Sequence, residues 1–464
     1  MTKIYMYSRR IIFIIASLLI VVKLPAQKKP NIIVIVSDDG GYEDFGCYNG
    51  KDVNTPHIDA LSKSGIRFTS AYTTASVCAP SRAGILTGRY QQRFGFDHNL
   101  SSIVATGVSK DDVGLGDGVK TIADYVKQQD YATIAIGKWH LGHAEKHHPR
   151  NRGFDHFFGF IGGARSYFPM ANVNKESEIQ DDEQVFPERN ISYLTDNLTD
   201  KALSYIDRYK DKPFFMYLSY NAVHTPMEAK STTYAKYQHI QDSTRRTFLA
   251  MLEDMDNNIG RVVHYLKANN LYDNTLIFFV NDNGAATNNG ANNGMWRGLK
   301  GSKWEGGTRV PMIINYPNKV SSSYVSKAVV STMDILKTIV DETNAKSLPH
   351  QVLDGKNILK TYRGKGHEYL FWRRGVASAV RYKNWKMIKV DSTEALLFDL
   401  ENDPREQIDV ASTYPKVIEK MNVQLEKWKK KMLPPKWYSS YGDYNQIMKH
   451  RIEVRGRDQE RKYL

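Results

Sequence analysis

Residues 31–41 read NIIVIVSDDGG, an apolar and mostly β-branched run that ends in two aspartates. Such a run, without alternating polar residues, is typical of a strand that is buried on both faces of a mainly parallel sheet. Asp38 and Asp39 follow within two residues, so we expect both carboxylates at the carboxyl end of that strand.

Three further apolar runs lead into polar residues of kinds that occur in active sites. They are YATIAI at 131–136 before Lys138 and His140, residues 214–220 before His224, and TLIFFV at 275–280 before Asp282 and Asn283. Helical spacing of apolar residues marks 121–128 and 247–267. The pattern predicts an α/β fold with a large, mainly parallel sheet flanked by helices. Because such sheets bind ligands beyond the carboxyl ends of their strands, we expect these polar groups to converge on one pocket.

Residues 78–88, CAPSRAGILTG, predict a helix that begins next to a cysteine. Pro80 suits the first helical position, where no amide donor is needed, and Gly88 suits the end of the helix. Cys78 would then lie at the helix N-terminus, where free amides and the helix dipole favour an anionic group. If the segment held only Cys-x-Pro, the plainer interpretation would be a surface helix that happens to follow a cysteine.

The same eleven residues match the signature CxPSRxxxLTG, and on it the chain resembles the type I sulfatases of the alkaline-phosphatase-like superfamily. The resemblance implies that a maturation enzyme oxidises Cys78 to formylglycine, an aldehyde that hydrates to a gem-diol. One hydroxyl would attack the sulfur of a sulfate monoester, and the other would then collapse to the carbonyl and expel sulfate. A serine or cysteine would instead be left sulfated, and its release would need a second displacement at sulfur.

Two segments resemble the metal-binding segments of that family, DDGG at 38–41 and NDNG at 281–284. By the resemblance, one divalent cation would be bound by an oxygen of the modified Cys78 and by the side chains of Asp38, Asp39, Asp282 and Asn283. Hard oxygen ligands favour Ca²⁺ or Mg²⁺ over Zn²⁺, and Ca²⁺ is the commoner metal in the family. The cation would act as a Lewis acid and as a template for the ester.

The resemblance also assigns cationic and basic groups around the nucleophile. Arg82, within the signature, would stabilise the charged form of the hydrated aldehyde. GKWHLG at 137–142 matches a family segment in which Lys138 would bind a sulfate oxygen and His140 would take a proton from the gem-diol.

The leaving alcohol would receive its proton from His224 together with a lysine. The match is weaker here, because Val223 stands where many members of the family have proline. Lys300 is the predicted partner, since it lies five residues before Glu305 of the EGG segment, which is the usual family spacing. Lys303 is the competing lysine.

The 464 residues suffice for a large domain and a smaller one, and a content of 41% hydrophobic and 25% charged residues is ordinary for a globular protein. Residues 1–26 place basic residues before an apolar run that ends in LPA, which predicts a signal peptide and an exported, periplasmic or secreted protein. The run is too short to span a bilayer comfortably, so no stable membrane span is expected. The catalytic domain is predicted at 27–360.

Residues 361–464 predict a smaller subdomain and a basic tail. Short strand candidates lie at 368–372, 377–382, 385–390 and 396–399, and an amphipathic helix is expected at 414–432. Half of the chain's net charge of +14 lies after residue 415, where it would steer a polyanion or form a solvated face. No nucleic-acid motif accompanies this charge, so nucleic acid is not an expected partner.

These features predict a calcium-dependent sulfatase that hydrolyses sulfate monoesters, with sulfated carbohydrate as the substrate class. Two alternatives stay open: a phosphate or phosphonate ester hydrolase of the same superfamily, and an inactive carbohydrate-binding protein on the same scaffold. With only two cysteines in the chain, no disulfide framework is expected, and Cys47 is predicted to be a small packed side chain.

Overall fold

A ten-stranded sheet forms the centre of the computed structural model, which describes residues 29–320, 323–390 and 394–438. The strand order is β11-β2-β10-β9-β1-β8-β4-β5-β6-β7. The strands are β1 (Asn31–Ser37), β2 (Ile66–Phe68), β4 (Ala132–Lys138), β5 (His156–Phe160), β6 (Gln180–Asp181), β7 (Gln184–Val185), β8 (Phe214–Ser219), β9 (Thr275–Asn281), β10 (Met312–Asn315) and β11 (Tyr324–Ser326). From β9 to β5 all neighbours are parallel, whereas β10 is antiparallel to β9. The predicted α/β class is confirmed, and the four apolar runs are the adjacent strands β9, β1, β8 and β4.

The strand register places the carboxyl ends of these four strands at one level. Ser37 of β1 pairs with Asn281 of β9, and Val36 of β1 pairs with Ser219 of β8. Ser219 also pairs with Gly137 of β4. The segments that follow the four strands therefore leave the sheet at one edge, where we expect the polar groups to meet.

Ten helices lie in the described part of the chain. They are α1 (Pro56–Lys63), α2 (Cys78–Thr87), α3 (Ile122–Lys127), α4 (Leu194–Arg208), α5 (Ser231–Tyr234), α6 (Ser243–Ala268), α7 (Glu305–Thr308), α8 (Asp334–Thr343), α9 (Ile358–Thr361) and α10 (Pro415–Lys429). The predicted helix at 247–267 is confirmed, with an earlier start because Asp242 accepts hydrogen bonds from the amides of Thr244 and Arg245. Within the described ranges, none of these helices has both the length and the apolarity that crossing a bilayer requires.

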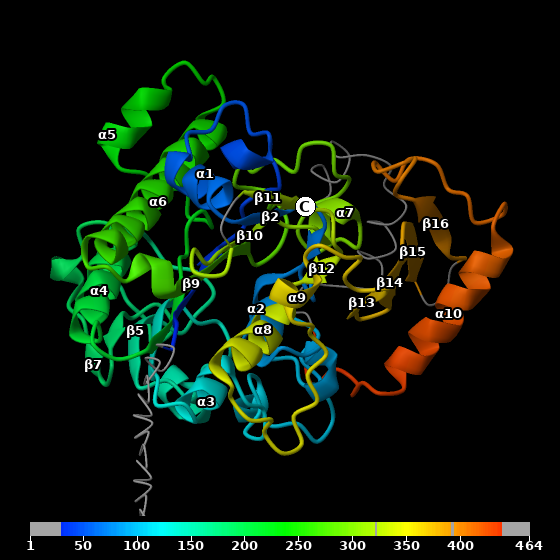
Figure 1. The fold of residues 1–464 in the computed structure, drawn as a ribbon, viewed down its shortest axis with the longest axis horizontal. Coiled ribbons are helices and arrows are strands. Elements are labelled where there is room, and N and C mark those ends of the chain that lie inside the picture. The colour runs from blue at the N-terminus through cyan, green and yellow to red at the C-terminus, as the bar shows by residue number, and fades with distance from the viewer. Residues whose placement is uncertain (1–28, 321–322, 391–393, 439–464) are drawn as a thin grey trace, which may run out of the picture.

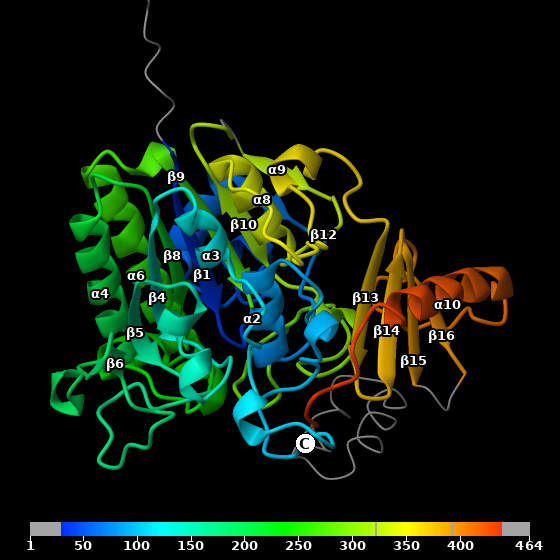
Figure 2. The ribbon, with the colours of Figure 1, turned by 90° about the horizontal axis from the view of Figure 1, so that it is seen from below.

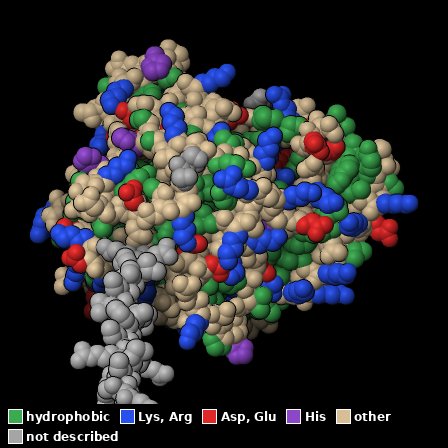
Figure 3. Space-filling model, in the orientation of Figure 1, with side chains coloured by type: hydrophobic (Ala, Val, Ile, Leu, Met, Phe, Trp, Pro, Cys, Tyr) green, Lys and Arg blue, Asp and Glu red, His purple; other side chains and the backbone are tan. Residues whose placement is uncertain are grey.

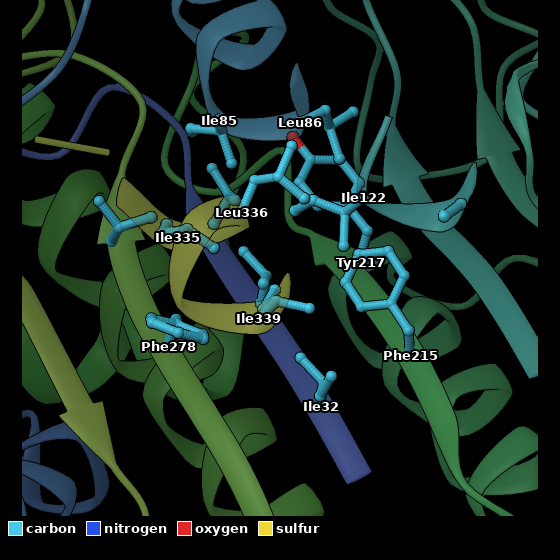
Figure 4. Close-up of a cluster of buried hydrophobic side chains, with 14 of the residues drawn as sticks. Ile32, Ile85, Leu86, Ile122, Phe215, Tyr217, Phe278, Ile335, Leu336 and Ile339 are labelled. Atoms are coloured by element: carbon cyan, nitrogen blue, oxygen red, sulfur yellow. The ribbon is translucent and has the colours of Figure 1, made fainter. Parts of the chain in front are cut away.

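The side chains of β1 alternate between two cores, as the two-residue period of a strand requires. Ile32, Val34 and Val36 belong to the core that includes side chains of α2, α3 and α8. Ile33 and Ile35 belong to the core that includes side chains of α1, α4 and α6. These two sets of helices cover opposite faces of the sheet (Figures 1 and 2), and Figure 4 shows the first core. Because helices cover both faces of the sheet, the side chains of β1 are buried on either side, which explains the apolar sequence of the strand.

Helix α2 begins at Cys78, and all ten of its residues are buried. Pro80 is therefore the third helical residue rather than the first, which still costs no hydrogen bond because first-turn amides have no acceptor within the helix. Gly88 ends the helix with a φ of 62°, a left-handed conformation that glycine adopts readily. The surface-helix interpretation of this segment is wrong, since the helix lies inside the molecule.

The predicted strands and helix of the smaller subdomain are confirmed. Four antiparallel strands, β13 (Tyr369–Arg374), β14 (Ala377–Tyr382), β15 (Trp385–Val390) and β16 (Leu396–Asp399), form its sheet. Helix α10 packs on it through Met421, Leu425 and Trp428. A two-stranded pair, β3 (Ala71–Tyr72) and β12 (Val330–Ser331), lies in the larger part. The predicted signal peptide at 1–26 and the basic tail after Tyr438 lie outside the described residues.

Candidate active site

Cys78, the first residue of α2, lies against the two aspartates that follow β1. Its Sγ is 3.7 Å from Asp38 Oδ1 and 3.9 Å from Asp39 Oδ1. Asp39 has a φ of 63°, a left-handed conformation that aspartate adopts more readily than most residues other than glycine. Burial raises the pKa of the Cys78 thiol to about 12, although Lys138 and Lys300 oppose this rise. The unmodified residue is therefore a neutral thiol at pH 7, which is a poor nucleophile.

The side chains around Cys78 include a set that fits a divalent cation. Ligand atoms of Asp38, Asp39, Cys78 and His224 lie within 4.8 Å of one another. Asn283 Nδ2 donates to Asp39 Oδ1 at 2.7 Å, while Asn283 Oδ1 is buried and has no hydrogen-bond partner in the described part of the chain. An orphaned amide oxygen beside carboxylates matches the oxygen donors that Ca²⁺ and Mg²⁺ prefer.

Asp282, the fourth predicted oxygen ligand, lies directly after β9 at the same edge. Its Oδ1 accepts from Asp39 N at 3.3 Å, and its Oδ2 accepts from Arg82 Nε at 2.9 Å. Burial and then the charge of Asp38 raise the pKa of Asp282 to about 6. A bound cation would lower the pKa of Asp282 again, because a cation favours the charged form of each carboxylate.

Two lysines neutralise the aspartates. Lys138 Nζ, at the end of β4, lies 2.5 Å from Asp38 Oδ2, and Lys300 Nζ lies 2.7 Å from Asp39 Oδ1. Although burial alone would raise the pKa of Asp39, the charges of Lys300 and Lys138 hold it well below its usual range. Asp39 in turn raises the pKa of Lys300 against the effect of burial. Lys300 therefore stays charged and lies where an anionic group would bind.

Arg82 lies one helical turn after the start of α2, so its guanidinium reaches the same carboxylates. Its Nη2 is 2.9 Å from Asp282 Oδ2 and 3.5 Å from Asp38 Oδ2. Its Nη1 donates to the Lys138 carbonyl at 3.1 Å and to the Ser219 hydroxyl. Burial would lower the pKa of Arg82, but Asp282 and Asp38 raise it above its usual value. The guanidinium is thus a fixed positive charge in the site.

Both predicted histidines reach the site with neutral rings. Burial, followed by the charge of Lys138, lowers the pKa of both, and that of His224 falls to about 3. His224 Nε2 lies 3.5 Å from Asp39 Oδ2, and its Nδ1 lies 2.6 Å from the Thr225 carbonyl. His140 Nδ1 is buried without a hydrogen-bond partner among the described residues. Both rings are therefore unprotonated near neutral pH.

The competing lysine, Lys303, is buried, but its charge acts on Asp97 and His98. Lys300, by contrast, contacts Asp39. Cys47 is a half-buried free thiol, and burial raises its pKa to about 12. The structure thus brings together the nine predicted site residues, Asp38, Asp39, Cys78, Arg82, Lys138, His140, His224, Asp282 and Asn283, with Lys300 as the tenth; the roles assigned to them stay predictions.

Two further residues support the site without belonging to any motif of the sequence. Asn289 Nδ2 donates to the carbonyls of Asp39 and Val223, at 3.1 Å each, and so joins two loops. Tyr167 Oη donates to the carbonyl of His224 at 2.8 Å. Neither residue has a characteristic spacing from the residue it supports, so only the structure reveals them.

A mainly parallel sheet with a helix-borne cysteine, carboxylates and cations at its strand ends defines a hydrolase of the alkaline-phosphatase-like fold. Residues 30–345 match the sulfatase family model, and residues 300–431 match the model for the C-terminal part of N-sulphoglucosamine sulphohydrolase. The chain belongs to the sulfatase family and is a sulfuric ester hydrolase.

Individual relatives match most of this chain in sequence. Mouse arylsulfatase J is 27% identical over 469 residues, covering 88% of this chain and 77% of the relative. Mouse steryl-sulfatase is 30% identical over 451 residues, covering 78% of this chain and 71% of the relative. Among solved structures, the crystal structure of Ps i-CgsB in complex with k-i-k-neocarrahexaose is 34% identical with a TM-score of 0.83, and the match covers 94% of this chain and all of that one.

Proposed function

We propose that this enzyme hydrolyses sulfate monoesters of a sulfated carbohydrate after oxidation of Cys78 to formylglycine, with one bound Ca²⁺. The proposal rests on the convergence of Cys78 with two aspartates and two lysines at the ends of neighbouring strands. Formylglycine would supply a hydrated aldehyde as nucleophile, and the cation would supply Lewis-acid polarisation of a sulfate oxygen. Asp38, Asp39, Asp282 and Asn283 are the residues that would hold the cation, and Mg²⁺ suits the same oxygens.

Three fixed cations would stabilise the transition state of sulfuryl transfer. Sulfuryl oxygens gain negative charge there, and Lys138, Lys300 and Arg82 are already oriented by buried carboxylates. Because the protein has placed these charges before the substrate arrives, little reorganisation accompanies the reaction.

The two histidines would move protons on opposite sides of the sulfur. His140 is neutral and lacks a partner at Nδ1 within the described structure, so it would accept a proton from the oxygen carried by residue 78. The negative charge of a bound ester would raise the pKa of His224, which would then protonate the leaving alcohol. Lys300 shares Asp39 with His224 and would take part in this step.

Carbohydrate is the proposed substrate class because the 34% identical structure is a complex with k-i-k-neocarrahexaose. The predicted signal peptide at 1–26 supports the same choice, since an exported enzyme would meet polysaccharide outside the cytoplasm. We propose export accordingly; N-terminal sequencing of the exported protein should begin near residue 27.

Hydrolysis of 4-nitrophenyl sulfate and 4-nitrophenyl phosphate separates this function from that of a phosphate ester hydrolase. We expect kcat/KM for the sulfate to be higher by about 100-fold or more. Mass spectrometry of the peptide that contains residue 78 should show the aldehyde. Faster turnover of the phosphate, or activity with an unmodified thiol, would refute the proposal.

Removal of the metal gives a second, independent measurement. Dialysis against a chelator should abolish hydrolysis of 4-nitrophenyl sulfate, and added Ca²⁺ should restore it. The buried carboxylates should also repel one another more strongly without the cation, so the chelated protein should unfold at a lower temperature. Full activity after chelation would show that the carboxylates hold no catalytic metal.

A further inference from the structure

Helix α10 and the residues directly after it carry a row of exposed lysines beside the buried side of the helix. Met421, Leu425 and Trp428 pack on the small sheet. Five exposed lysines belong to α10 and the two residues after it, and we call them the lysine stripe: Lys416, Lys420 and Lys427 in the helix, and Lys430 and Lys431 directly after it. Lys416, Lys420 and Lys427 are spaced four and seven apart, so they share one side of the helix, and at 1.5 Å per residue they span about 16 Å.

Positive charge outnumbers negative charge along the lysine stripe. From Pro415 to Tyr438 the chain has seven lysines and two glutamates, and no aspartate. Among the described residues, no carboxylate forms an ion pair with Lys416, Lys427 or Lys430. Figure 3 shows the Lys and Arg side chains gathered over α10 at the right of the molecule. Like charges held this close repel one another, so a polyanion that bound along them would be favoured by the lost repulsion and by released counterions.

Aromatic rings lie at the beginning of the lysine stripe. Tyr414, directly before α10, is 43% exposed, and its ring centroid is 4.8 Å from that of the partly buried Trp385. Lys420 Nζ lies 2.7 Å from the Tyr382 hydroxyl. Flat rings offer apolar contact to the C–H face of a sugar, while ammonium groups bind sulfate. A surface with both features fits a sulfated sugar chain better than it fits an anionic membrane.

The far end of the lysine stripe leads to the rim of the active site. Leu433, two residues after it, donates its amide to the Gln92 carbonyl at 2.9 Å. Trp437 Nε1 donates to the Asn99 carbonyl at 3.0 Å, and Asn99 Oδ1 accepts from Ala79 N, next to Cys78, at 3.1 Å. A polymer bound along α10 therefore lies on a part of the molecule that is joined directly to the catalytic helix.

We propose that the lysine stripe is a second binding surface, outside the catalytic pocket, for the sulfated polysaccharide whose ester the enzyme cleaves. The proposal rests on the function proposed above and extends it, because it assigns a polymer rather than a small sugar as the preferred substrate. Binding at α10 would raise the local concentration of ester groups at the pocket, so the gain would appear only with polymeric substrates.

The test compares two variants with the same loss of charge. In one, Lys416, Lys420, Lys427 and Lys431 are each replaced by Gln; in the control, four exposed lysines of the larger domain, Lys51, Lys63, Lys110 and Lys175, are replaced by Gln. We expect Kd for dextran sulfate at low salt to rise about 10-fold or more in the first variant, with a weaker salt dependence, and to change less than about 2-fold in the control. Equal affinities of the two variants would overturn the proposal.

Two further measurements identify the polymer that binds the lysine stripe and distinguish this proposal from the proposed catalytic function. Duplex DNA or phosphatidylglycerol vesicles that bound these lysines more tightly than dextran sulfate would overturn the choice of polysaccharide, and uncharged dextran should not bind. Turnover of 4-nitrophenyl sulfate should be unchanged in both variants, whereas desulfation of the polymer should fall only in the first. Dextran sulfate binding is measured without turnover. The binding result would therefore still test the lysine stripe if the proposed catalytic function were wrong.

Discussion

At the scale of single residues, Cys78 is the group on which the proposed chemistry depends. Replacement of Cys78 by Ala removes the sulfur from which an aldehyde would be made, while the helix it begins keeps its packing through its other buried residues. We expect kcat for 4-nitrophenyl sulfate to fall at least 10³-fold, roughly the effect of removing a catalytic nucleophile. Thermal unfolding measured by circular dichroism should change little. Retained activity in a properly folded Cys78→Ala protein would refute the proposed nucleophile.

Tyr167 offers a sharper test of the role of His224. The buried Tyr167 hydroxyl lies 2.7 Å from the Asn221 carbonyl and 2.8 Å from the His224 carbonyl, so it holds the loop that carries His224. A Tyr167→Phe variant lacks these hydrogen bonds, so His224 should be less well positioned. Loss of its proton should slow the reaction most for esters whose alcohol is a poor leaving group. We expect kcat to fall about 10-fold or more for an alkyl or sugar sulfate, and by less than about 3-fold for 4-nitrophenyl sulfate.

A neighbouring tyrosine is the matched control for this prediction. Tyr193 stacks on Tyr167 with 5.6 Å between ring centroids, but its hydroxyl donates to the Glu228 carbonyl. Tyr193→Phe should therefore lose stability, on the order of 1 kcal/mol for a buried hydrogen bond, without discriminating between the two substrates. An equal loss of rate on both substrates in Tyr167→Phe would mean that Tyr167 has only a structural role.

At the scale of elements, the sequence predicts the central strands well because both of their faces are buried. A continuous apolar run such as residues 275–280 is typical of a strand that is covered on both faces, and β9 ends one residue beyond this run. The short outer strands carry no such signal: β6 and β7 have two residues each and are partly or fully exposed. The site residues could be predicted because they belong to recognisable sequence motifs, whereas the supporting residues Asn289 and Tyr167 depend on contacts that no local pattern encodes.

Helix α1 shows how one element is completed by another. Its N-cap residue, Thr55, makes no side-chain capping bond. Asp256 of α6 instead accepts from the amides of His57 and Ile58, at 3.1 Å and 2.8 Å. A carboxylate supplied from a different helix thus caps the first turn of α1, which couples the positions of the two helices.

This contact should make the stability of the fold depend on pH. Burial raises the pKa of Asp256 to about 7, above the usual 3.8, despite the amide bonds from Ile58 and His57. The folded state therefore holds the proton more tightly than the unfolded state, and this contribution to stability is lost as pH rises from about 4 through 7. Relative to wild type, Asp256→Asn should be more destabilised at pH 5 than at pH 8, measured by urea unfolding. A difference that is constant or grows with pH would contradict this assignment.

At the scale of the whole molecule, the small subdomain and the catalytic domain meet in a buried ionic cluster. Lys386 Nζ of β15 lies 2.8 Å from Glu305 Oε1 and 3.6 Å from Glu406 Oε1, and all three side chains are fully buried. Glu406 Oε2 also accepts from the Glu305 amide at 2.7 Å, where α7 begins. Because Glu305 lies five residues after Lys300, the subdomain helps to hold the segment that carries Lys300.

Replacement of Lys386 by Met should therefore affect both stability and activity. It leaves two carboxylates buried without their shared cation, which costs about 3–5 kcal/mol of unfolding free energy. Burial already raises the pKa of Glu406 to about 7 despite Lys386. Without the lysine the folded state should bind protons still more tightly, so the variant should lose more stability at pH 8 than at pH 5.5. Lys389→Met, on the same strand but partly exposed, is the control.

Urea unfolding followed by tryptophan fluorescence, with 4-nitrophenyl sulfate turnover measured at each concentration, tests this coupling. If the two parts unfold as one unit, Lys386→Met should shift both curves together to lower urea, whereas Lys389→Met should shift neither. The double variant Lys386→Met with Glu305→Gln removes one of the two carboxylates that have lost the lysine and should recover part of the stability. A Lys386→Met protein that unfolds in two steps, with activity outlasting the first, would show that the catalytic domain does not need the subdomain to hold Lys300 in place.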